Sequence, residues 1–160
     1  MNTVPAPTPW VLPVVLTGRR VRLEPLSRDH LADLVVVGLE PSIWALTIAR
    51  PVDPGGIAAW LDGALAGAAA GVEMPFATID LTSGRAIGSS RFMSIVPDHR
   101  RLEIGWTWVG RAFQRTGANR EAKLLQLSHA FDDLGANRVE FKTDARNDMS
   151  RAALLGMGAT

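Results

Sequence analysis

The hydrophobic pattern changes from a helical period after Met74, and three successive stretches near the middle of the chain are typical of β-strands. The three stretches cover residues 76–81, 86–96 and 101–109. Short segments rich in Gly, Ser, Pro and Asp separate them, and such segments form tight turns. The pattern therefore predicts three consecutive strands joined as an antiparallel meander.

The third stretch has the clearest alternation. Its apolar positions are Leu102, Ile104, Trp106 and Trp108, and the positions between them are Glu103, Gly105 and Thr107. Because the side chains of a regular strand point alternately to opposite faces, we expect the four apolar side chains to share one face of the sheet.

One strand and two helices are predicted before the meander. Val21 and Leu23 alternate with charged residues after a glycine turn, which indicates a strand. Ser27 is a suitable N-cap for a helix that ends near Pro41. Asp53 is followed by proline, a combination that begins helices, and apolar residues then recur every three or four positions.

Two helices and one strand are predicted after the meander. The first helix is expected to end at Gly135 and to bury a stripe made of Leu124, Leu127, Phe131 and Leu134. Residues 139–144 alternate and indicate a strand. Asn147 or Asp148 is a suitable cap for a last helix that extends through Leu155. The strand that follows a crossover helix lies parallel to the strand before it, so the sheet is expected to be mixed.

The composition is that of an ordinary folded protein. The chain has 160 residues, of which 47% are hydrophobic and 21% are charged, and its formal net charge is +1. This length suits one domain, and we expect a proline-rich extended arm over residues 1–13 and a folded domain over residues 14–160. Lysine and arginine occur singly or in pairs, which argues against a nucleic-acid partner.

Two missing residue types limit the chemistry. Cysteine is absent, which excludes disulfides, thiolate ligands and a cysteine nucleophile, and tyrosine is absent as a general acid. The histidines have no neighbouring ligands, so no metal site is predicted. The string His129-x-x-x-Asp133 is interpreted as a solvated pair one helical turn apart. No signal-like N-terminus or long apolar run is present, so we expect a cytoplasmic protein with no membrane partner.

A basic, glycine-containing loop joins the third strand of the meander to the next helix. From Gly110 to Asn119 it reads Gly-Arg-Ala-Phe-Gln-Arg-Thr-Gly-Ala-Asn. Free backbone N–H groups and the positive end of a helix attract anions, most often phosphates. The loop has neither the Gly-Lys-Ser/Thr of a P-loop nor the spacing of a dinucleotide fingerprint. It therefore predicts a phosphate-bearing ligand of another class, and an ordinary strand-to-helix connection is the alternative.

The element order and several short motifs resemble the GNAT acetyltransferase superfamily, in particular its RimJ/RimL-like branch. The motifs are Ile87-Gly88, Glu103-Ile104-Gly105-Trp106, the segment from Gln114 to Asn119, Asn147-x-x-Ser150 and Gly158-Ala159. Asn119 departs from the loop pattern, which has Gly or Ala at that position. The resemblance covers residues 16–159 and implies an α+β fold with a mixed, mostly antiparallel central sheet flanked by helices.

The resemblance also implies acetyl-CoA as the co-substrate, because in the superfamily this loop holds the pyrophosphate of acyl-CoA. The implied contact residues are Gln114, Arg115, Thr116, Gly117, Ala118, Asn119 and Arg120. In the superfamily the pantetheine arm lies between the strand before the loop and the strand after the helix. Trp108, Val109 and Asn147 are the residues that the resemblance places along this arm.

Two residues are candidates for the acid–base chemistry of acetyl transfer. Glu103 is a carboxylate beside the expected arm and could act as a base through water. An ion pair with Arg91 or Arg101 is the alternative role for Glu103. Ser150 is the candidate acid, and a position in the helix cap beside Asn147 is its alternative role. Main-chain amides that polarise the thioester carbonyl are a third contribution.

The function implied is an N-acetyltransferase in which the amine of a small molecule or a protein N-terminus attacks acetyl-CoA directly. Superfamily members normally continue with two more strands that form a C-terminal hairpin, and this sequence ends at Thr160, where the first would begin. A fragment, a partner chain that supplies the strands, as in a strand-exchanged homodimer, and a degraded paralogue are three explanations. A non-catalytic acyl-CoA-binding module or an inactive fragment is therefore the alternative function.

Overall fold

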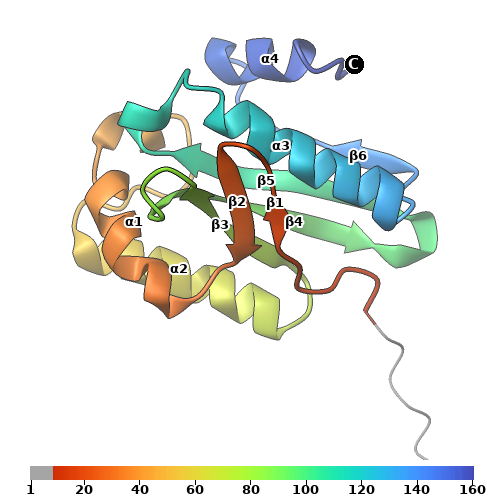
Figure 1. Cartoon of the computed structure of the whole chain (residues 1–160), viewed down its shortest axis with the longest axis horizontal. Coiled ribbons are helices and arrows are strands. Elements are labelled where there is room, and N and C mark those ends of the chain that lie inside the picture. The colour runs from red at the N-terminus through yellow and green to blue at the C-terminus, as the bar shows by residue number, and fades with distance from the viewer. Residues whose placement is uncertain (1–8) are drawn as a thin grey trace, which may run out of the picture.

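A six-stranded sheet forms the centre of the protein in a computed structural model that describes residues 9–160 (Figure 1). The strands lie in the order β1-β2-β3-β4-β5-β6. Their bounds are β1 Leu16–Thr17, β2 Val21–Pro25, β3 Met74–Asp80, β4 Ala86–Val96, β5 Arg101–Val109 and β6 Arg138–Glu140. Strands β1 to β5 are antiparallel to their neighbours, and β6 is parallel to β5. The expected mixed, mostly antiparallel sheet is confirmed.

Helices cover both faces of this sheet (Figure 1). The α-helices are α1 Leu31–Gly38, α2 Pro54–Ala69, α3 Ala118–Ser128 and α4 Asp148–Leu155, and a π-helical segment His129–Asp133 continues α3. Short 3-10 helices occupy Arg28–His30, Pro41–Trp44, Pro97–His99 and Arg111–Phe113. Helix α3 lies on one face, and α1 and α2 lie on the other. Of the helices that the structure describes, none combines the length and apolar character that crossing a bilayer requires.

Side-chain caps begin two of the helices as the sequence predicts. Asp53 accepts a hydrogen bond from the Gly56 N–H at 2.8 Å at the start of α2. Asn147 accepts one from the Ser150 N–H at 3.0 Å at the start of α4. Each bond satisfies a backbone donor that the first helical turn leaves without a partner.

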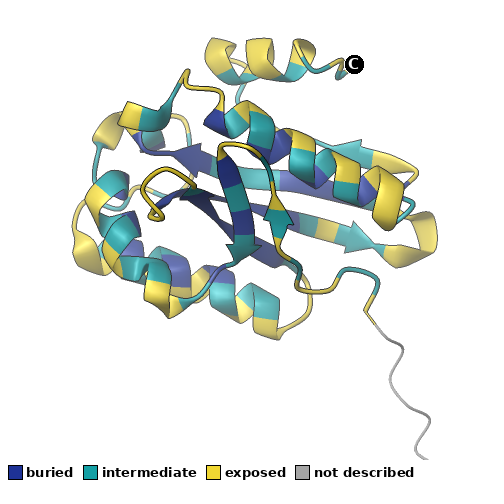
Figure 2. Ribbon diagram, viewed as in Figure 1, coloured by how far each residue is buried: buried dark blue, intermediate teal, exposed yellow. Residues whose placement is uncertain are grey.

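The buried side chains form two separate cores, one on each face of the sheet (Figure 2). On the α3 face, the rings of Phe76 and Phe92 meet edge to face at 5.4 Å between centroids. On the α1 and α2 face, Trp108 packs against Trp44 and Trp60 with centroid separations of 5.0 and 5.5 Å. Aromatic pairs in these geometries add to the stabilisation that burial gives.

A bulge in β5 separates residues that the sequence places together. Ser89 pairs with Trp108 but Arg91 pairs with Gly105, so β5 has one residue more than β4 in this interval. Trp106 takes up the extra residue with a φ of +50°. Beyond this point the alternation is reversed. The expectation that Trp106 and Trp108 share a face with Leu102 and Ile104 is therefore wrong: Trp108 lies in the core beneath α1 and α2, and Trp106 contacts Arg91, which also contacts Trp60 of α2.

The buried stripe of α3 also differs from the predicted one. Leu124 and Phe131 are 60% and 46% exposed, so the predicted stripe is wrong at these two positions. The positions that face the sheet from this helix and its continuation are Ala118, Ala122, Lys123, Gln126 and Ala130. The alanines allow a close approach of the helix to the sheet. Gln126 Oε1 accepts a hydrogen bond from Ser90 Oγ at 2.9 Å, which supplies a partner inside the core.

The two ends of the described chain are attached differently. Trp10 packs against the core on the α3 face, and its Nε1 donates to the Leu134 carbonyl at 3.0 Å. Residues 1–8 of the expected arm lie outside the described residues.

The expected strand over residues 139–144 is shorter in the structure, because only 138–140 form β6. Helix α4 contains no buried residue.

Lys123 is a buried cation in the core beneath α3. Its side chain is almost fully enclosed, and no carboxylate in residues 9–160 pairs with it. Burial therefore lowers the pKa of Lys123 to about 8. The ammonium lies 5.6 Å from the centre of the Phe141 ring, a cation–π contact that offsets part of the desolvation cost.

Replacing Lys123 with Met should stabilise the free protein by about 2 kcal/mol at pH 7, since each pKa unit corresponds to about 1.4 kcal/mol and Phe141 returns part of the cost. The cost of the buried charge is full below pH 8 and disappears as the pH rises toward the unfolded pKa of about 10.4. Urea unfolding of both proteins at several pH values measures this difference.

The other lysine of the chain provides the contrast. Lys142 is exposed and binds the buried carboxylate of Glu103, so Lys142→Met should lower the free energy of unfolding instead. A destabilised Lys123→Met protein, or a stability difference that does not change above pH 8, would contradict the account of Lys123.

Candidate functional site

The segment that joins β5 to α3 is shaped by two residues with left-handed backbone conformations. After the 3-10 turn at Arg111–Phe113, Arg115 has a φ of +62° and Gly117 a φ of +92°. Thr116 holds the turn between them, because its hydroxyl donates to the Phe113 carbonyl at 2.7 Å. Gly117 is the residue immediately before α3, and glycine adopts its conformation without strain.

The backbone N–H groups of this segment are available to a ligand. Within residues 9–160, no protein acceptor meets the N–H groups of Arg115, Thr116, Gly117, Asn119 and Arg120. The first N–H groups of any helix lack intrahelical partners, and here the free donors extend back into the loop. Free N–H groups at the positive end of a helix dipole are chemically suited to an anion.

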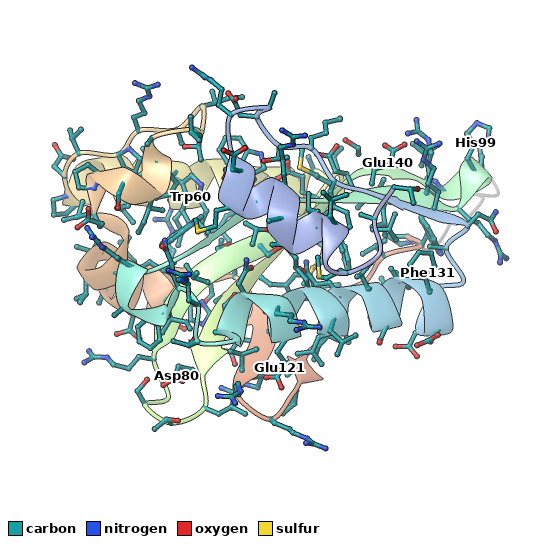
Figure 3. The ribbon with its side chains drawn as sticks, turned by 90° about the horizontal axis from the view of Figure 1, so that it is seen from above. Trp60, Asp80, His99, Glu121, Phe131 and Glu140 are labelled. Carbon is teal, nitrogen blue, oxygen red and sulfur yellow. The ribbon has the colours of Figure 1, made fainter. Side chains whose placement is uncertain are left out.

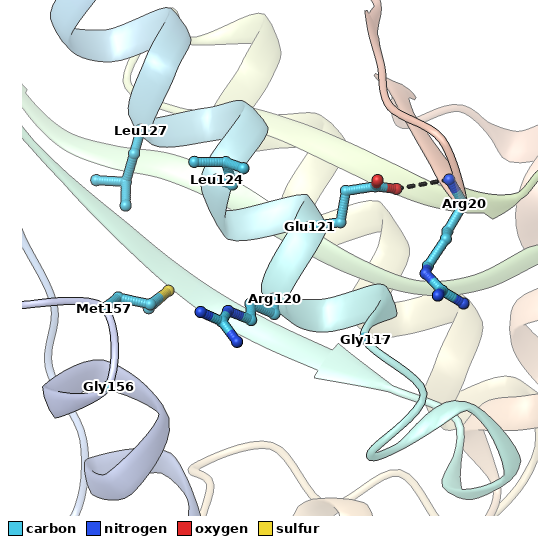
Figure 4. A pocket seen from close by; sticks show the side chains of 8 residues that line it. All are labelled: Arg20, Gly117, Arg120, Glu121, Leu124, Leu127, Gly156 and Met157. Atoms are coloured by element: carbon cyan, nitrogen blue, oxygen red, sulfur yellow. Dashed lines mark hydrogen bonds between the residues drawn. The ribbon is translucent and has the colours of Figure 1, made fainter.

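A hollow of about 500 Å³ lies beside these N–H groups (Figure 4). Its lining residues are Arg20, Gly117, Arg120, Glu121, Leu124, Leu127, Gly156 and Met157. Two guanidinium groups and an apolar floor therefore lie together at the start of α3. This combination suits a ligand that has phosphates attached to a less polar group.

Glu121 connects the start of α3 to the turn between β1 and β2, and Figure 3 labels it near that turn. Its carboxylate accepts hydrogen bonds from the backbone N–H groups of Arg19, Arg20 and Val21 at 3.0, 2.7 and 2.8 Å. Burial alone would raise the pKa of Glu121, but these donors and the nearby Arg20 side chain outweigh it and lower the pKa. The contact places Arg20 at the hollow (Figure 4), a position that the sequence analysis missed because about one hundred residues separate it from the loop.

Strand β5 has an open edge next to this site. Its pairing with β6 is limited to residues 101–103, so from Ile104 to Val109 no described strand covers that edge. Strands β5 and β6 thus separate at the end nearer the loop, as the resemblance implies. The side chains of Trp108 and Val109 are buried, and the Val109 carbonyl accepts from Gln114 Nε2 at 3.5 Å.

Glu103 lies on β5 with its carboxylate almost fully buried. The ammonium of the exposed Lys142 contacts Glu103 Oε2 at 2.7 Å. Ser94 Oγ donates to the same oxygen at 3.3 Å. The carboxylate also raises the pKa of Lys142, through their hydrogen bond. An ion pair was the alternative role considered for Glu103, with Arg91 or Arg101 as its partner; the structure has the ion pair with Lys142 instead, because Arg91 and Arg101 bind Glu73 and Glu140.

Ser150 and Asn147 lie together at the start of α4. The Asn147 side chain accepts from the Ser150 backbone N–H, which is the capping arrangement considered as the alternative role for this pair. The Ser150 hydroxyl has no protein partner among the described residues. It is therefore free to contact a ligand, while the amide oxygen of Asn147 is already used in the cap.

His129 and Asp133 form the expected pair along one helical turn. The distance from His129 Nδ1 to Asp133 Oδ2 is 2.7 Å. Only Asp133 is well exposed, because the His129 ring stacks on Phe92 with a centroid separation of 6.2 Å. Residues 9–160 contain no group of three or more His, Asp or Glu side chains arranged to hold a metal ion.

Comparisons with known proteins identify the family. A family model described as an acetyltransferase (GNAT) domain matches residues 20–160. A GCN5-related N-acetyltransferase from Brucella melitensis is 30% identical, with a TM-score of 0.86 over 94% of this chain and 69% of that chain. A T. thermophilus protein assigned as an acetyltransferase is 35% identical, with a TM-score of 0.83 over 94% of this chain and 78% of that chain.

A more distant match shows the same fold in a protein with a bound ligand. RimJ from Mycobacterium smegmatis, in complex with CoA-disulfide, has 21% identity and a TM-score of 0.76 over 91% of this chain and 75% of that chain. Comparison with curated proteins gives no match. The family match and the two relatives that are at least 30% identical lead to one assignment. The chain belongs to the GNAT family of acetyltransferases, which transfer acetyl groups from acetyl-CoA.

Proposed function

We propose that this protein is an N-acetyltransferase that transfers an acetyl group from acetyl-CoA to the amine of a small molecule or a protein N-terminus. The observation that carries the proposal is the set of free backbone N–H groups at the start of α3, beside the open edge of β5. An extended ligand with a phosphate at one end and amide groups along its length is complementary to both features.

The loop and the first turn of α3 bind the pyrophosphate of acetyl-CoA. The backbone of Arg115 to Arg120 supplies the donors, and Gln114 precedes them in extended conformation. Arg20 and Arg120 add charge-assisted bonds from the two sides of the hollow. Gly117 has only the Arg20 side chain near the position that a Cβ would occupy, so the backbone is open to close approach by the phosphates.

The pantetheine arm lies along the open edge of β5. The main chain of Trp108 and Val109 pairs with its amides as a neighbouring strand would. Asn147 and Ser150, at the start of α4, face the arm from the other side. This placement brings the thioester to the part of β5 where the bulge at Trp106 interrupts the regular pairing with β4.

The reaction is a direct attack within a ternary complex. The neutral amine nitrogen forms a bond to the thioester carbonyl carbon, the C–S bond breaks, and the thiolate takes a proton as CoA leaves. Glu103 accepts the proton that the amine loses, through a water molecule, and Ser150 donates to the departing sulfur. Backbone N–H groups of β5 near the bulge polarise the thioester carbonyl.

A non-catalytic acyl-CoA-binding module is the second candidate function. The observation that favours it is the ion pair between Glu103 and Lys142, which occupies the proposed base. Calorimetry with acetyl-CoA and CoA, followed by a thiol-release assay with a panel of amines, separates the two. Binding without turnover of any amine would support the module, and turnover would exclude it.

The loop can be tested with Gly117→Trp. An indole at this position fills the space beside the free N–H groups, so the affinity for CoA measured by calorimetry should fall at least about a hundredfold, the loss of about 3 kcal/mol expected when several charge-assisted bonds are blocked. Gly84→Trp is the matched control, because Gly84 also has a positive φ and open space around it but does not line the hollow. Unchanged CoA affinity in Gly117→Trp would place the site elsewhere.

The base can be tested with Glu103→Gln. At neutral pH this change should lower kcat about a hundredfold or more, the usual contribution of a general base. The loss should shrink at high pH, where more of the amine is already neutral. Glu140→Gln, on the neighbouring strand, is the control and should keep the pH profile of the original protein. A loss for Glu103→Gln that is the same at every pH would indicate a structural role.

A further inference from the structure

A second cavity lies on the opposite side of β5 from α3, between α2 and strands β4 and β5. Its volume is about 650 Å³, and the segment 48–51 forms its rim. The residues that give it chemical character are Arg50, Trp60, Glu73, Arg91 and Trp106. We call it the α2 cavity. The bulge residue Trp106 lies in its wall, so the cavity reaches the part of β5 where the proposed function places the thioester.

Arg91 is the most enclosed charged group in the α2 cavity. It is only 5% exposed, and its guanidinium lies between two indoles, 5.7 Å from the Trp60 ring and 5.1 Å from the Trp106 ring. Glu73 Oε2 binds Nη1 of Arg91 at 2.6 Å. The stacking and the ion pair fix the plane of the guanidinium.

Most of the donors of Arg91 have no protein partner. A guanidinium has five N–H donors. In the described part of the chain, only Nη1 of Arg91 meets an acceptor, and Nε is both buried and unpaired. The indole N–H of Trp60 is also buried and unpaired. Nη2 of Arg91 also has no acceptor, but it is not one of these enclosed atoms, so it is the unpaired donor that an oxygen-bearing ligand in the cavity can reach.

The charges that line the α2 cavity indicate whether the oxygen-bearing group of the ligand is neutral or negatively charged. Arg50 and Arg91 line it, and Glu73 is the one carboxylate that lines it among the described residues. These three side chains leave the cavity with one excess positive charge, which a single negative charge on the ligand would neutralise. A carboxylate also matches the planar fork of a guanidinium, whereas a neutral carbonyl engages only part of it.

We infer that the α2 cavity binds the acceptor and that Arg91 recognises a carboxylate on it. This inference rests on the proposed function, because the amine must reach a thioester held at the β5 bulge. Trp106 lies at that bulge and contacts Arg91, so the carboxylate and the amine of the acceptor are only a few bonds apart. The acceptor class is therefore a small amine that carries a carboxylate, of which a free amino acid is the simplest. The indole walls favour an apolar or aromatic side chain.

The test compares three amines that share one side chain: L-phenylalanine, L-phenylalanine amide and 2-phenylethylamine. The amide represents the amine of a peptide, with a carbonyl but no negative charge. In a thiol-release assay with acetyl-CoA, kcat/KM is calculated for the neutral form of each amine. The value for phenylalanine should exceed those for the other two by about a hundredfold or more, because the analogues offer no carboxylate to the Arg91 donors that Glu73 leaves free. Equal or better use of the amide or of 2-phenylethylamine would overturn the inference.

Two arginine variants identify the group responsible. Arg91→Lys keeps the positive charge but loses the planar fork. The ratio of kcat/KM for phenylalanine to kcat/KM for 2-phenylethylamine should therefore fall at least about tenfold. Arg85→Lys is the matched control, because Arg85 also pairs with a carboxylate, that of Asp33, but lies outside the α2 cavity. This control should keep the full preference. A preference that Arg91→Lys leaves unchanged would overturn the role of Arg91.

Direct measurement of phenylalanine binding tests the inference without requiring turnover. Tryptophan fluorescence in the presence of CoA should change on addition of phenylalanine, since Trp60 and Trp106 line the α2 cavity. If phenylalanine binds but no amine releases CoA, the carboxylate site is supported and the proposed transfer is not. If phenylalanine binds no better than 2-phenylethylamine, the inference is overturned, whether or not transfer occurs.

Discussion

The bulge in β5 is the constraint on which the arrangement of this protein depends. One extra residue at Trp106 reverses the alternation of the strand, so Leu102 and Ile104 pack under α3 while Trp108 packs under α1 and α2. The same residue brings an indole over Arg91 on the face opposite α3. Bulges are often found beside active sites, where they redirect side chains and interrupt pairing. Here the bulge separates the space assigned to acetyl-CoA from the α2 cavity assigned to the acceptor.

Much of the fold follows from local patterns in the sequence. The bounds of β4 and β5 agree with the stretches of alternating residues, because turn residues on both sides determine where each strand ends. The caps at Asp53 and Asn147 were predicted for a similar reason, since a cap depends on a side chain and on the three residues that follow it. The loop before α3 was also found from local composition, and the structure leaves most of its N–H groups without a protein acceptor.

The features that the sequence did not reveal depend on contacts between distant segments. No local pattern predicts the positive φ of Trp106, so the face of Trp108 was assigned wrongly. The contact of Glu121 with the β1–β2 turn, which brings Arg20 to the hollow, joins residues about one hundred positions apart. Lys123 is buried while Leu124 of the predicted leucine stripe is exposed, and no local pattern in the sequence distinguishes the two positions. The roles of Glu103 and Ser150 remain proposals.

The claim at the centre of this account is that the backbone at the start of α3 holds the pyrophosphate of acetyl-CoA. Amide NMR spectra recorded during a titration with CoA test it directly. The largest shifts and the greatest slowing of hydrogen exchange are expected at the free N–H groups of residues 115–117, 119 and 120, with little change in the turn at 82–84. Binding of CoA with no change at residues 115–120, or no binding at all, would contradict the account.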